Sequence, residues 1–576
     1  MKIKHLFGLA VIAAMTASCS SNEALGTAGP GTGTNEAGVG YATFTINLPS
    51  VSGTRAADAG GAEMDEGTPE EYKVSNATAL IFQKYGSDEG SYKFVESVTL
   101  PIDGWTDDPT PGITTTSKKL VAKLTNVDTK NDYSVLILLN NKKVNLPTVG
   151  QSYNDWNSKN ILTPSVTDWA GSDGFYMANA PLKGSAASPA TLVHINKNNI
   201  YASVTEANDP TKDCAATVFV ERGVAKMSVA DPTPTDPIKV KDKATKAETE
   251  STVKFNNWAL DITNKKTYAV HNIDGLSADY AEIWKPTGRF FGTNGRVYWG
   301  KDPNYSMPEL KDANLTGDTK RSEEFNFITS IDDINKTFDK PVYCLENTFD
   351  LANMYQGQTT RVIFKATYAP KDDKGKSLAE EDGTFYTIGN MTTILNETKL
   401  TAAVDAVAKT VLPTGYHIDY TNIKKKGSHV ITLEDIKDGG GATLGEATGT
   451  AIVKEINDKL GLTDGEGLAE GRPEARVGIN TYKKGVTYYI ARVKHFGSLT
   501  DWHSGESYGD NNDKYLGRYG MLRNNWYELT VGNVYGPGYP GVPPVDPTLP
   551  DDENEKYLSV SVKILSWAKR SDTVDL

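Results

Sequence analysis

The sequence predicts a mainly β protein with two domains of the antiparallel sandwich type. At 576 residues the chain exceeds the size of one ordinary domain. Thr, Asn and Tyr recur in short runs that alternate apolar and polar side chains, the pattern of half-buried strands. The balance of 60 Lys+Arg against 73 Asp+Glu leaves a net charge of -13. This charge argues against a nucleic-acid-binding protein, because phosphate contacts need a basic surface.

Residues 1–19 are predicted to be a lipoprotein signal peptide. A basic start precedes the apolar run 6–14, which is too short to span a bilayer as a permanent helix. Small residues stand directly before Cys19, an arrangement in which the cysteine is acylated and becomes the new N-terminus, although Thr16 departs from the usual aliphatic residue. Two acyl chains suffice for stable membrane anchoring. An ordinary signal peptide with a chance cysteine is the alternative.

Residues 20–55 are expected to form a flexible tether that ends in a first strand and a cleavage site. Residues 20–40 carry almost no apolar side chains and cannot order themselves by burial. The following residues alternate in polarity until Pro49. The apolar face of this strand consists of Ala42, Phe44, Ile46 and Leu48.

Arg55 is the one basic residue in the small, polar segment 50–61. A trypsin-like protease requires an extended, exposed chain with a basic side chain, so the bond between Arg55 and Ala56 is a candidate cleavage site. An ordinary loop arginine is the alternative.

Further strands are predicted on both sides of a Pro-rich, apolar-poor segment at 230–237. This segment is the predicted boundary between an N-terminal domain over 56–236 and a C-terminal domain over 237–576. The predicted strands are 78–83, 133–139, 217–229, 251–262, 361–368 and 486–494.

Two helical stripes are predicted in the second domain, as insertions packed on a sheet and not as a separate domain. The second of them ends at Gly461, a common residue just past a helix. The stripes consist of Ala402, Ala403, Ala406, Val407 and Val411, and of Ile452, Val453, Ile456 and Leu460.

The chain ends in a predicted strand that follows a Gly- and Pro-rich linker at 536–550. Two assignments stay open for this segment. It completes the sandwich of its own chain, or part of it, such as the polar tail 568–576, reaches another molecule. The residues concerned are Leu558, Val560, Val562 and Ile564 on one face, then Trp567, Val574 and Leu576.

No catalytic, cofactor or metal site is predicted. The sequence lacks the nucleophile elbow G-x-S-x-G, the zinc motif H-E-x-x-H and the phosphate-binding G-x-x-x-x-G-K-[ST]. His495, Asp501 and His503 are interpreted as scattered residues, and 510–513 lacks the glycine and glutamate of an EF-hand. We therefore expect a protein that is not an enzyme.

Cysteine usage is low. Beyond Cys19, only Cys214 and Cys344 remain. They could pair in an oxidising compartment, but two separate buried thiols are expected, because a disulfide framework would need more cysteines.

Five segments spread over most of the chain carry a resemblance to a known family. They are VFVERGVAKMSV at 218–229, NWALDITNKKTY at 257–268, YCLENT at 343–348 with GQTTRV at 357–362, YGMLRNNWYEL at 519–529, and the terminal strand around Trp567. In this order and behind a lipobox, they resemble the fimbrillins of Bacteroidales bacteria, especially the minor-fimbrium (Mfa-like) shaft subunits.

The resemblance implies two transthyretin-like β-sandwich domains and assembly of the type V pilus kind. It implies a precursor that reaches the outer membrane as a lipoprotein and loses its first strand when an Arg-specific protease cuts after Arg55. The subunit then polymerises by donor-strand exchange into extracellular fimbriae that support adhesion, without a cofactor. The implied partners are other copies of the chain arranged head-to-tail, accessory tip and anchor subunits, the protease, and host or bacterial surface receptors.

The physics of this scheme follows from the first strand. Its loss would expose an apolar slot and unpaired backbone groups, an edge that invites a strand from the next copy. Such a contact propagates as a filament. A shaft subunit is favoured over a tip adhesin, because a tip has no further neighbour and need not keep a donor segment. The alternative function is a glycan-binding surface lipoprotein that stays anchored and monomeric.

Overall fold

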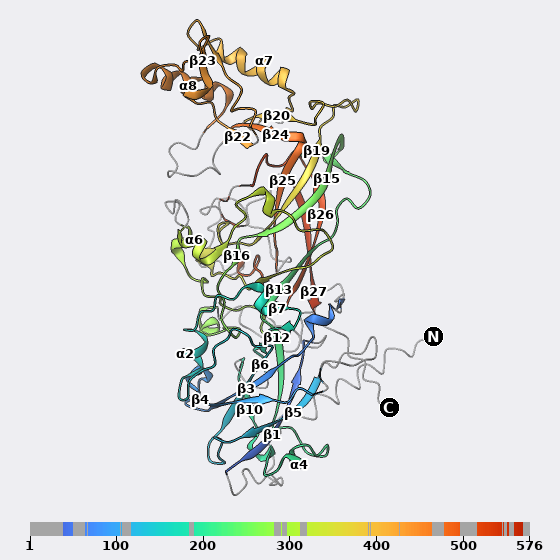
Figure 1. Cartoon of the computed structure of the whole chain (residues 1–576), viewed down its shortest axis with the longest axis vertical. Coiled ribbons are helices and arrows are strands. Elements are labelled where there is room, and N and C mark those ends of the chain that lie inside the picture. The colour runs from blue at the N-terminus through green and yellow to red at the C-terminus, as the bar shows by residue number, and fades with distance from the viewer. Residues whose placement is uncertain are drawn as a thin grey trace, which may run out of the picture.

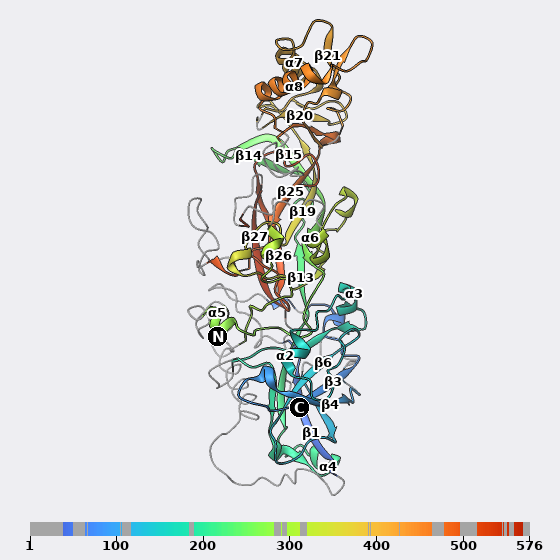
Figure 2. The ribbon, with the colours of Figure 1, turned by 90° about the vertical axis from the view of Figure 1, so that its left-hand side faces the viewer.

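The protein is elongated, and its sheets follow one another along the long axis (Figures 1 and 2). The structure is a computed structural model. It describes residues 38–49, 64–65, 67–103, 105, 117–183, 189–280, 290, 296–311, 319–389, 391, 393–425, 427–463, 477–495, 515–543, 545, 550–551 and 558–567. For β2, and for β27 apart from Ser559, Val560 and Val562, only the backbone is described. No helix in these residues is long and apolar enough to cross a membrane.

One end of the molecule is a nine-stranded sheet that wraps around a single apolar core, here called the N-terminal sandwich. Its ladder runs β11-β1-β12-β9-β6-β3-β4, with β5 paired to β1 and β10 paired to β6. The strands are β1 (Gly40–Asn47), β3 (Ala77–Gln83), β4 (Lys93–Leu100), β5 (Ser117–Leu124), β6 (Tyr133–Leu139), β9 (Met177–Asn179), β10 (Val193–Ile195), β11 (Ile200–Tyr201) and β12 (Ala216–Arg222). Short elements between them are η2 (Pro69–Glu71), η3 (Glu89–Ser91), α2 (Tyr153–Asn157), α3 (Val166–Trp169), the pair β7 (Ala170–Gly171) and β8 (Gly174–Phe175), η4 (Lys197–Asn199) and α4 (Val204–Ala207).

The middle of the molecule is a second sandwich of two sheets, here called the C-terminal sandwich, with a core of its own. One sheet has the order β18-β13-β26-β27-β2 and the other the order β14-β15-β19-β25. The strands are β2 (Met64–Asp65), β13 (Val224–Val229), β14 (Ile238–Lys241), β15 (Glu248–Asp261), β18 (Val342–Leu345), β19 (Arg361–Ala369), β25 (Val486–Arg492), β26 (Trp526–Val534) and β27 (Leu558–Trp567). Nearby short elements are β16 (Thr263–Asn264), β17 (Phe325–Asn326), α5 (Leu276–Asp279), η5 (Pro308–Lys311), α6 (Thr319–Glu324), η6 (Ile331–Asp333), η7 (Leu351–Asn353) and η10 (Lys483–Gly485).

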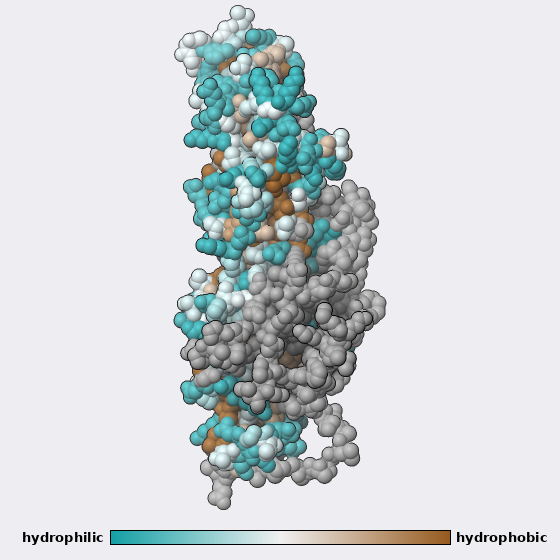
Figure 3. All heavy atoms as spheres, turned by 90° about the vertical axis from the view of Figure 1, so that its right-hand side faces the viewer, coloured by the Kyte–Doolittle hydropathy of each residue, from teal (hydrophilic) through white to brown (hydrophobic). Residues whose placement is uncertain are grey.

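The far end is a small α/β unit that leaves the C-terminal sandwich after β20 (Phe385–Ile388) and returns at β24 (Ile479–Tyr482), here called the inserted module. Its helices α7 (Glu397–Ala408) and α8 (Glu446–Leu460) bury their apolar stripes in a separate cluster. Its other elements are β21 (Tyr416–Ile418), β22 (Gly427–His429), η8 (Leu433–Asp435) and β23 (Ile436–Asp438). Over this module the face in Figure 3 is mostly hydrophilic, whereas hydrophobic side chains show along the middle of the molecule.

The ends of the two module helices follow from local sequence. Asn396 precedes α7, and its side chain accepts a hydrogen bond from the backbone N–H of Lys399. Gly461 follows α8 at φ 68, a left-handed conformation that glycine adopts without strain. The predicted insertion of two helices is therefore confirmed, although they have their own apolar core. The apolar stripe expected on the first helix is wrong in part, because Ala402 and Ala406 are exposed and α7 instead buries Leu400, Val404 and Ala408.

The predicted mainly β fold is also confirmed, with two departures. Three pairings are parallel, β1 with β12, β13 with β26 and β2 with β27, so the sheets are mixed. The single strand expected over 217–229 is wrong: it divides at Gly223 into β12 of one sandwich and β13 of the other. A Cβ at Gly223 would lie 2.6 Å from Trp169 Cε3, so the chain passes between the sandwiches where only glycine fits. The Pro-rich segment 230–237 follows this passage and leads from β13 to β14.

Candidate functional site

Strand β1 lies in the interior of the N-terminal sandwich and not at an edge. On one side it pairs antiparallel with β5 along its whole length, from Gly40 opposite Leu124 to Asn47 opposite Ser117. On the other side it pairs in parallel with β12 and, at its start, antiparallel with β11. The first strand of the chain is therefore held by ladders on both of its sides.

The apolar face of β1 is part of the core of this sandwich. Ala42, Phe44 and Ile46 are 0% exposed, and Leu48 just after the strand is 1% exposed. Burying an apolar side chain of Val, Leu, Ile or Phe size stabilises a fold by about 1.5–3 kcal/mol. Removing this strand would therefore open a deep apolar slot.

The opposite face of β1 is fixed by polar contacts. The hydroxyl of Thr43 donates to the carbonyl of Ala207 in α4 over 2.6 Å. The backbone N–H of Ala215 donates to the carbonyl of Thr43 over 2.7 Å. A strand that replaced β1 would thus have to bind in a specific register as well as fill an apolar slot.

The neighbours of β1 depend on it to different degrees. In the described part of the chain, β5 and β11 have no ladder partner other than β1. Strand β12 also pairs with β9, but only from Val220 to Arg222. Loss of β1 would leave the backbone of β5 without a ladder over its full length.

Strand β5 is also held at one end by β4, which lies beside it without a ladder in the described residues. The carboxylate of Glu96 in β4 accepts hydrogen bonds from the backbone N–H groups of Thr125 and Asn126, just after β5. The hydroxyl of Thr125 donates to the same carboxylate over 2.7 Å. Glu96 was not predicted from the sequence, although a glutamate on the buried face shared by Phe94 and Leu100 is a usable signal.

The predicted C-terminal strand is β27, and it completes the sandwich of its own chain. It pairs antiparallel with β26, from Trp526 opposite Leu565 to Val534 opposite Leu558. Val560 and Val562 pack partly buried against the core of the C-terminal sandwich. At its end, Ser566 and Trp567 pair in parallel with Met64 and Asp65 of β2.

The remaining predicted site residues lie outside the described residues or are described only in part. Cys19, Arg55, Ala56, Val574 and Leu576 are outside them. For Leu558, Ile564 and Trp567 only the backbone is described. By residue number, Arg55 comes after β1 and before β2, so a cut after it would separate β1 from the rest of the chain.

A buried polar network, which was not predicted from the sequence, lies where the two sandwiches meet. Glu71, at the end of η2, contacts Lys226 of β13 and accepts a hydrogen bond of 2.6 Å from the hydroxyl of Tyr343. Burial alone would raise the pKa of Glu71, but the charges of Arg222 and Lys226 outweigh it and lower this pKa. The chain that follows the predicted cleavage site is therefore fixed to the second sandwich.

A second part of this network centres on Glu221 of β12. Its carboxylate contacts Arg296 and lies 2.8 Å from His271 Nδ1. Burial would raise the pKa of Glu221, but the charges of Arg296 and His271 lower it to about 2. Beside it, Arg523 contacts Glu346 over 3.0 Å. The contacts of Glu221 with His271 and Arg296 connect β12 to loops of the C-terminal half.

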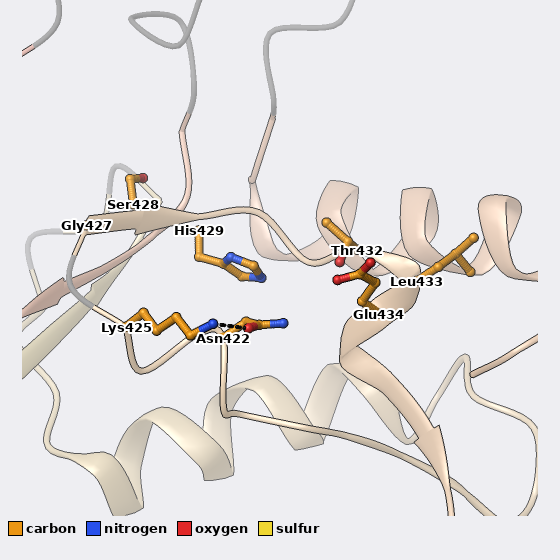
Figure 4. A pocket seen from close by; sticks show the side chains of 8 residues that line it. All are labelled: Asn422, Lys425, Gly427, Ser428, His429, Thr432, Leu433 and Glu434. Atoms are coloured by element: carbon orange, nitrogen blue, oxygen red, sulfur yellow. Dashed lines mark hydrogen bonds between the residues drawn. The ribbon is translucent and has the colours of Figure 1, made fainter. Parts of the chain in front are cut away.

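The inserted module contains a polar pocket of about 550 Å³ (Figure 4). The ring of His429 lies between Lys425 and Thr432, and its Nε2 is 2.8 Å from Asp435 Oδ2. Among the described residues, Leu433 is the one apolar side chain of the lining and no Phe, Tyr or Trp belongs to it, whereas small-molecule sites are mostly lined by apolar and aromatic side chains. Its lining residues are Asn422, Lys425, Gly427, Ser428, His429, Thr432, Leu433 and Glu434.

Histidine and cysteine residues do not form a metal centre in the described ranges, where no group of three or more His, Cys, Asp or Glu residues could hold an ion. His495 is buried and its Nδ1 lies 2.7 Å from the hydroxyl of Tyr527; Asp501, His503 and 510–513 are outside the described residues. Cys344 is a free, buried thiol and is not bonded to Cys214. The two cysteines are therefore not paired with each other, as expected.

The C-terminal region of the chain matches a known protein family. Residues 480–573, which include β25, β26 and β27, match the family described as "Major fimbrial subunit protein type IV, Fimbrillin, C-terminal". This region is therefore similar to the C-terminal part of the fimbrillins. The predicted resemblance to the fimbrillins is thereby confirmed, and two of its five segments lie within the matched residues.

Three solved structures are similar to this chain at low identity. A candidate cell adhesion protein from Parabacteroides distasonis has 10% identity and a TM-score of 0.39, with 92% of this chain and 99% of that chain covered. A fimbrial assembly protein from the same species has 12% identity and a TM-score of 0.25, with 62% and 93% covered. The tip fimbrial protein Mfa3 from Porphyromonas gingivalis, truncated at its C-terminus, has 11% identity and a TM-score of 0.29, with 92% and 100% covered. Comparison with curated proteins found no match.

Proposed function

We propose that this chain is a structural subunit of surface fimbriae whose polymerisation is triggered by the loss of β1. The single observation that carries the proposal is the position of β1, which is the first strand of the described residues, lies in the interior of its sheet and has a buried apolar face. The fimbrillin match of residues 480–573 agrees with a fimbrial role.

The proposed maturation begins with export as a lipoprotein acylated at Cys19 and anchored in the outer membrane. An Arg-specific protease then cuts between Arg55 and Ala56. Because Arg55 comes after β1 and before β2 in the chain, β1 stays covalently joined to the lipid anchor after the cut. Only non-covalent contacts then hold β1 in the sandwich. The rest of the chain is held through Glu71 and Lys226.

Departure of β1 would leave an apolar slot between β5 and β12. An unpaired strand edge of this kind readily accepts another strand. The proposed donor is the C-terminal segment of the next copy, namely the tail 568–576 with Val574 and Leu576, because β27 is already paired to β26. Refilling the positions of four apolar side chains would contribute on the order of 6–10 kcal/mol before the cost of ordering the donor.

The contact is head-to-tail, so it builds a filament instead of a closed dimer. The proposed partners are further copies of the chain, accessory tip and anchor subunits, an Arg-specific protease and surface receptors through which the fimbriae support adhesion. The proposed location of the mature subunit is the extracellular fimbrium.

The test is limited digestion of the purified precursor with an Arg-specific protease. Cleaved wild-type protein should start at Ala56 and form a ladder of SDS-resistant oligomers. Arg55→Lys should remain monomeric under the same protease, and the matched surface variant Lys73→Ala should behave as wild type. A variant that ends at Trp567 should be cleaved but stay monomeric, and ladders from that variant would contradict the proposed donor.

A further inference from the structure

Strand β5 loses the longest ladder of the N-terminal sandwich's strands when β1 leaves. Its ladder to β1 runs from Ser117 to Leu124, and the described residues offer it no other ladder. Its apolar side chains Leu120, Ala122 and Leu124 belong to the same core as Phe44 and Ile46. When β1 leaves, both its backbone pairing and part of its packing are lost together.

An unpaired strand beside an open apolar slot has two ways to lower its free energy. It can fray into solvent, or it can move across the slot and cover the exposed core. Either movement removes the site for an incoming strand, because strands in a sheet must lie about 4.8 Å apart to form a ladder. An acceptor slot therefore needs something that holds β5 in place without β1.

Glu96 makes the contacts that can do this. Its side chain is 8% exposed, and its carboxylate accepts from the backbone N–H of Thr125 over 3.0 and 3.2 Å and from that of Asn126 over 3.0 Å. The Thr125 hydroxyl and the Asn126 side-chain amide donate to it over 2.7 and 3.4 Å. Hydrogen bonds to an ionised acceptor are about twice as strong as neutral ones.

These contacts are independent of β1. Glu96 belongs to β4, which pairs with β3 on the far side of the core, and the residues that it binds come directly after β5. They fix the end of β5 at Leu124, the residue opposite Gly40 at the start of β1. The carboxylate thus joins β5, whose ladder is with β1, to β4, the last strand of the ladder order, on the side of β5 away from the slot.

We propose that Glu96 is a positioning residue that holds β5 against β4 after β1 has left, and so keeps the slot one strand wide for the incoming strand. This proposal rests on the proposed function and adds a residue that the exchange requires. A residue with a merely structural role would affect the precursor and the cleaved protein alike. A positioning role predicts a defect that is confined to the cleaved protein.

The test compares Glu96→Gln with wild type before and after cleavage, in chains that end at Trp567 so that the cleaved protein stays monomeric. Hydrogen exchange of the β5 amides, residues 117–124, is measured in both states. Uptake of a synthetic peptide with the sequence of residues 40–48 is then measured on the cleaved protein. Glu70→Gln, at an exposed site in η2, is the matched control, and Thr125→Ala is a milder variant that removes only the hydroxyl contact should Glu96→Gln fail to fold.

In the precursor, Glu96→Gln should protect the β5 amides as wild type does. After cleavage, β5 of Glu96→Gln should lose protection, and peptide uptake should be about tenfold slower or weaker, the change that corresponds to one charge-assisted hydrogen bond. Equal protection and equal uptake in the cleaved variant and wild type would overturn the proposal, as would a loss of β5 protection already in the precursor. If cleaved wild type takes up no peptide and full-length cleaved protein forms no oligomers, the proposed function fails, while the exchange of β5 still decides the role of Glu96.

Discussion

The ammonium group of Lys226 lies 2.8 Å from Glu71 Oε1, and neither side chain is more than 2% exposed. The same ammonium lies 3.4 Å from the centre of the Trp526 ring. This pair joins the chain that follows the predicted cleavage site to the sheet that contains β27.

Replacing Glu71 by Ala should therefore destabilise the protein strongly. The substitution leaves the charge of Lys226 buried without its partner, which costs about 3–5 kcal/mol. Urea unfolding followed by tryptophan fluorescence measures the loss of free energy of unfolding. Glu70→Ala, at the exposed neighbouring position, should change the free energy by less than about 0.5 kcal/mol, and similar values for the two variants would contradict the role given to Glu71.

Phe44→Ala should weaken the hold of the N-terminal sandwich on β1. The substitution creates a cavity in a site that is fully buried, and such changes cost about 3–5 kcal/mol. We expect faster hydrogen exchange across 40–47 in the uncleaved precursor, and slow oligomer formation without any protease. Thr45→Val, on the other face of β1, is the control. An unchanged exchange rate in Phe44→Ala would show that this side chain does not hold the strand.

Stability in acid should depend on Glu221. Its pKa in the folded protein is about 2, below the ordinary value of 4.5, so the ionised form is favoured by folding. The resulting stabilisation, about 3 kcal/mol, is complete above pH 4.5 and is lost as the pH falls from 4.5 towards 2. Thermal unfolding of Glu221→Gln should therefore show a shallower decline over this pH range than wild type. Parallel pH profiles of the two proteins would be evidence against this assignment.

Gly223→Ala should disturb the passage between the two sandwiches. The added Cβ would lie 2.6 and 2.7 Å from carbons of the Trp169 ring and 2.9 Å from Tyr176 Cδ1. Overpacking of this kind costs about 1–3 kcal/mol. Gly439→Ala, where no atom lies within 4 Å of the added Cβ, is the matched control. Calorimetry of both variants separates a local clash from a general effect of losing a glycine.

Local sequence predicted many elements of this fold because their periodicity is set within a few residues. The strand expected at 133–139 is β6 with the same bounds, and the helix expected to end at Gly461 is α8. One prediction that failed, a single strand over 217–229, concerns a feature that is set by contacts between residues distant in the sequence. The break at Gly223 depends on Trp169 and Tyr176, two residues far away in the sequence, and no periodicity reports such a contact.

The candidate site could be predicted only in part for the same reason. The alternation from Ala42 to Leu48 indicates a strand with a buried face, but not that β5 and β12 flank it. The pairing of Glu71 with Lys226 and of Glu96 with Thr125 joins residues that no local pattern connects. A charged residue on the apolar face of a strand, as at Glu96, is the one local sign of such a contact.

The inserted module begins and ends at neighbouring points. Ile388 pairs with Ile479, and the backbone N–H of Gly389 donates to the carbonyl of Gly478 over 3.0 Å. Its buried side chains form their own cluster, apart from the core of the C-terminal sandwich. Units with adjacent ends and an independent core tolerate exchange. A foreign domain grafted between these two glycines would then be carried once per subunit, which makes this position suited to the display of an antigen or an enzyme in a repeating array.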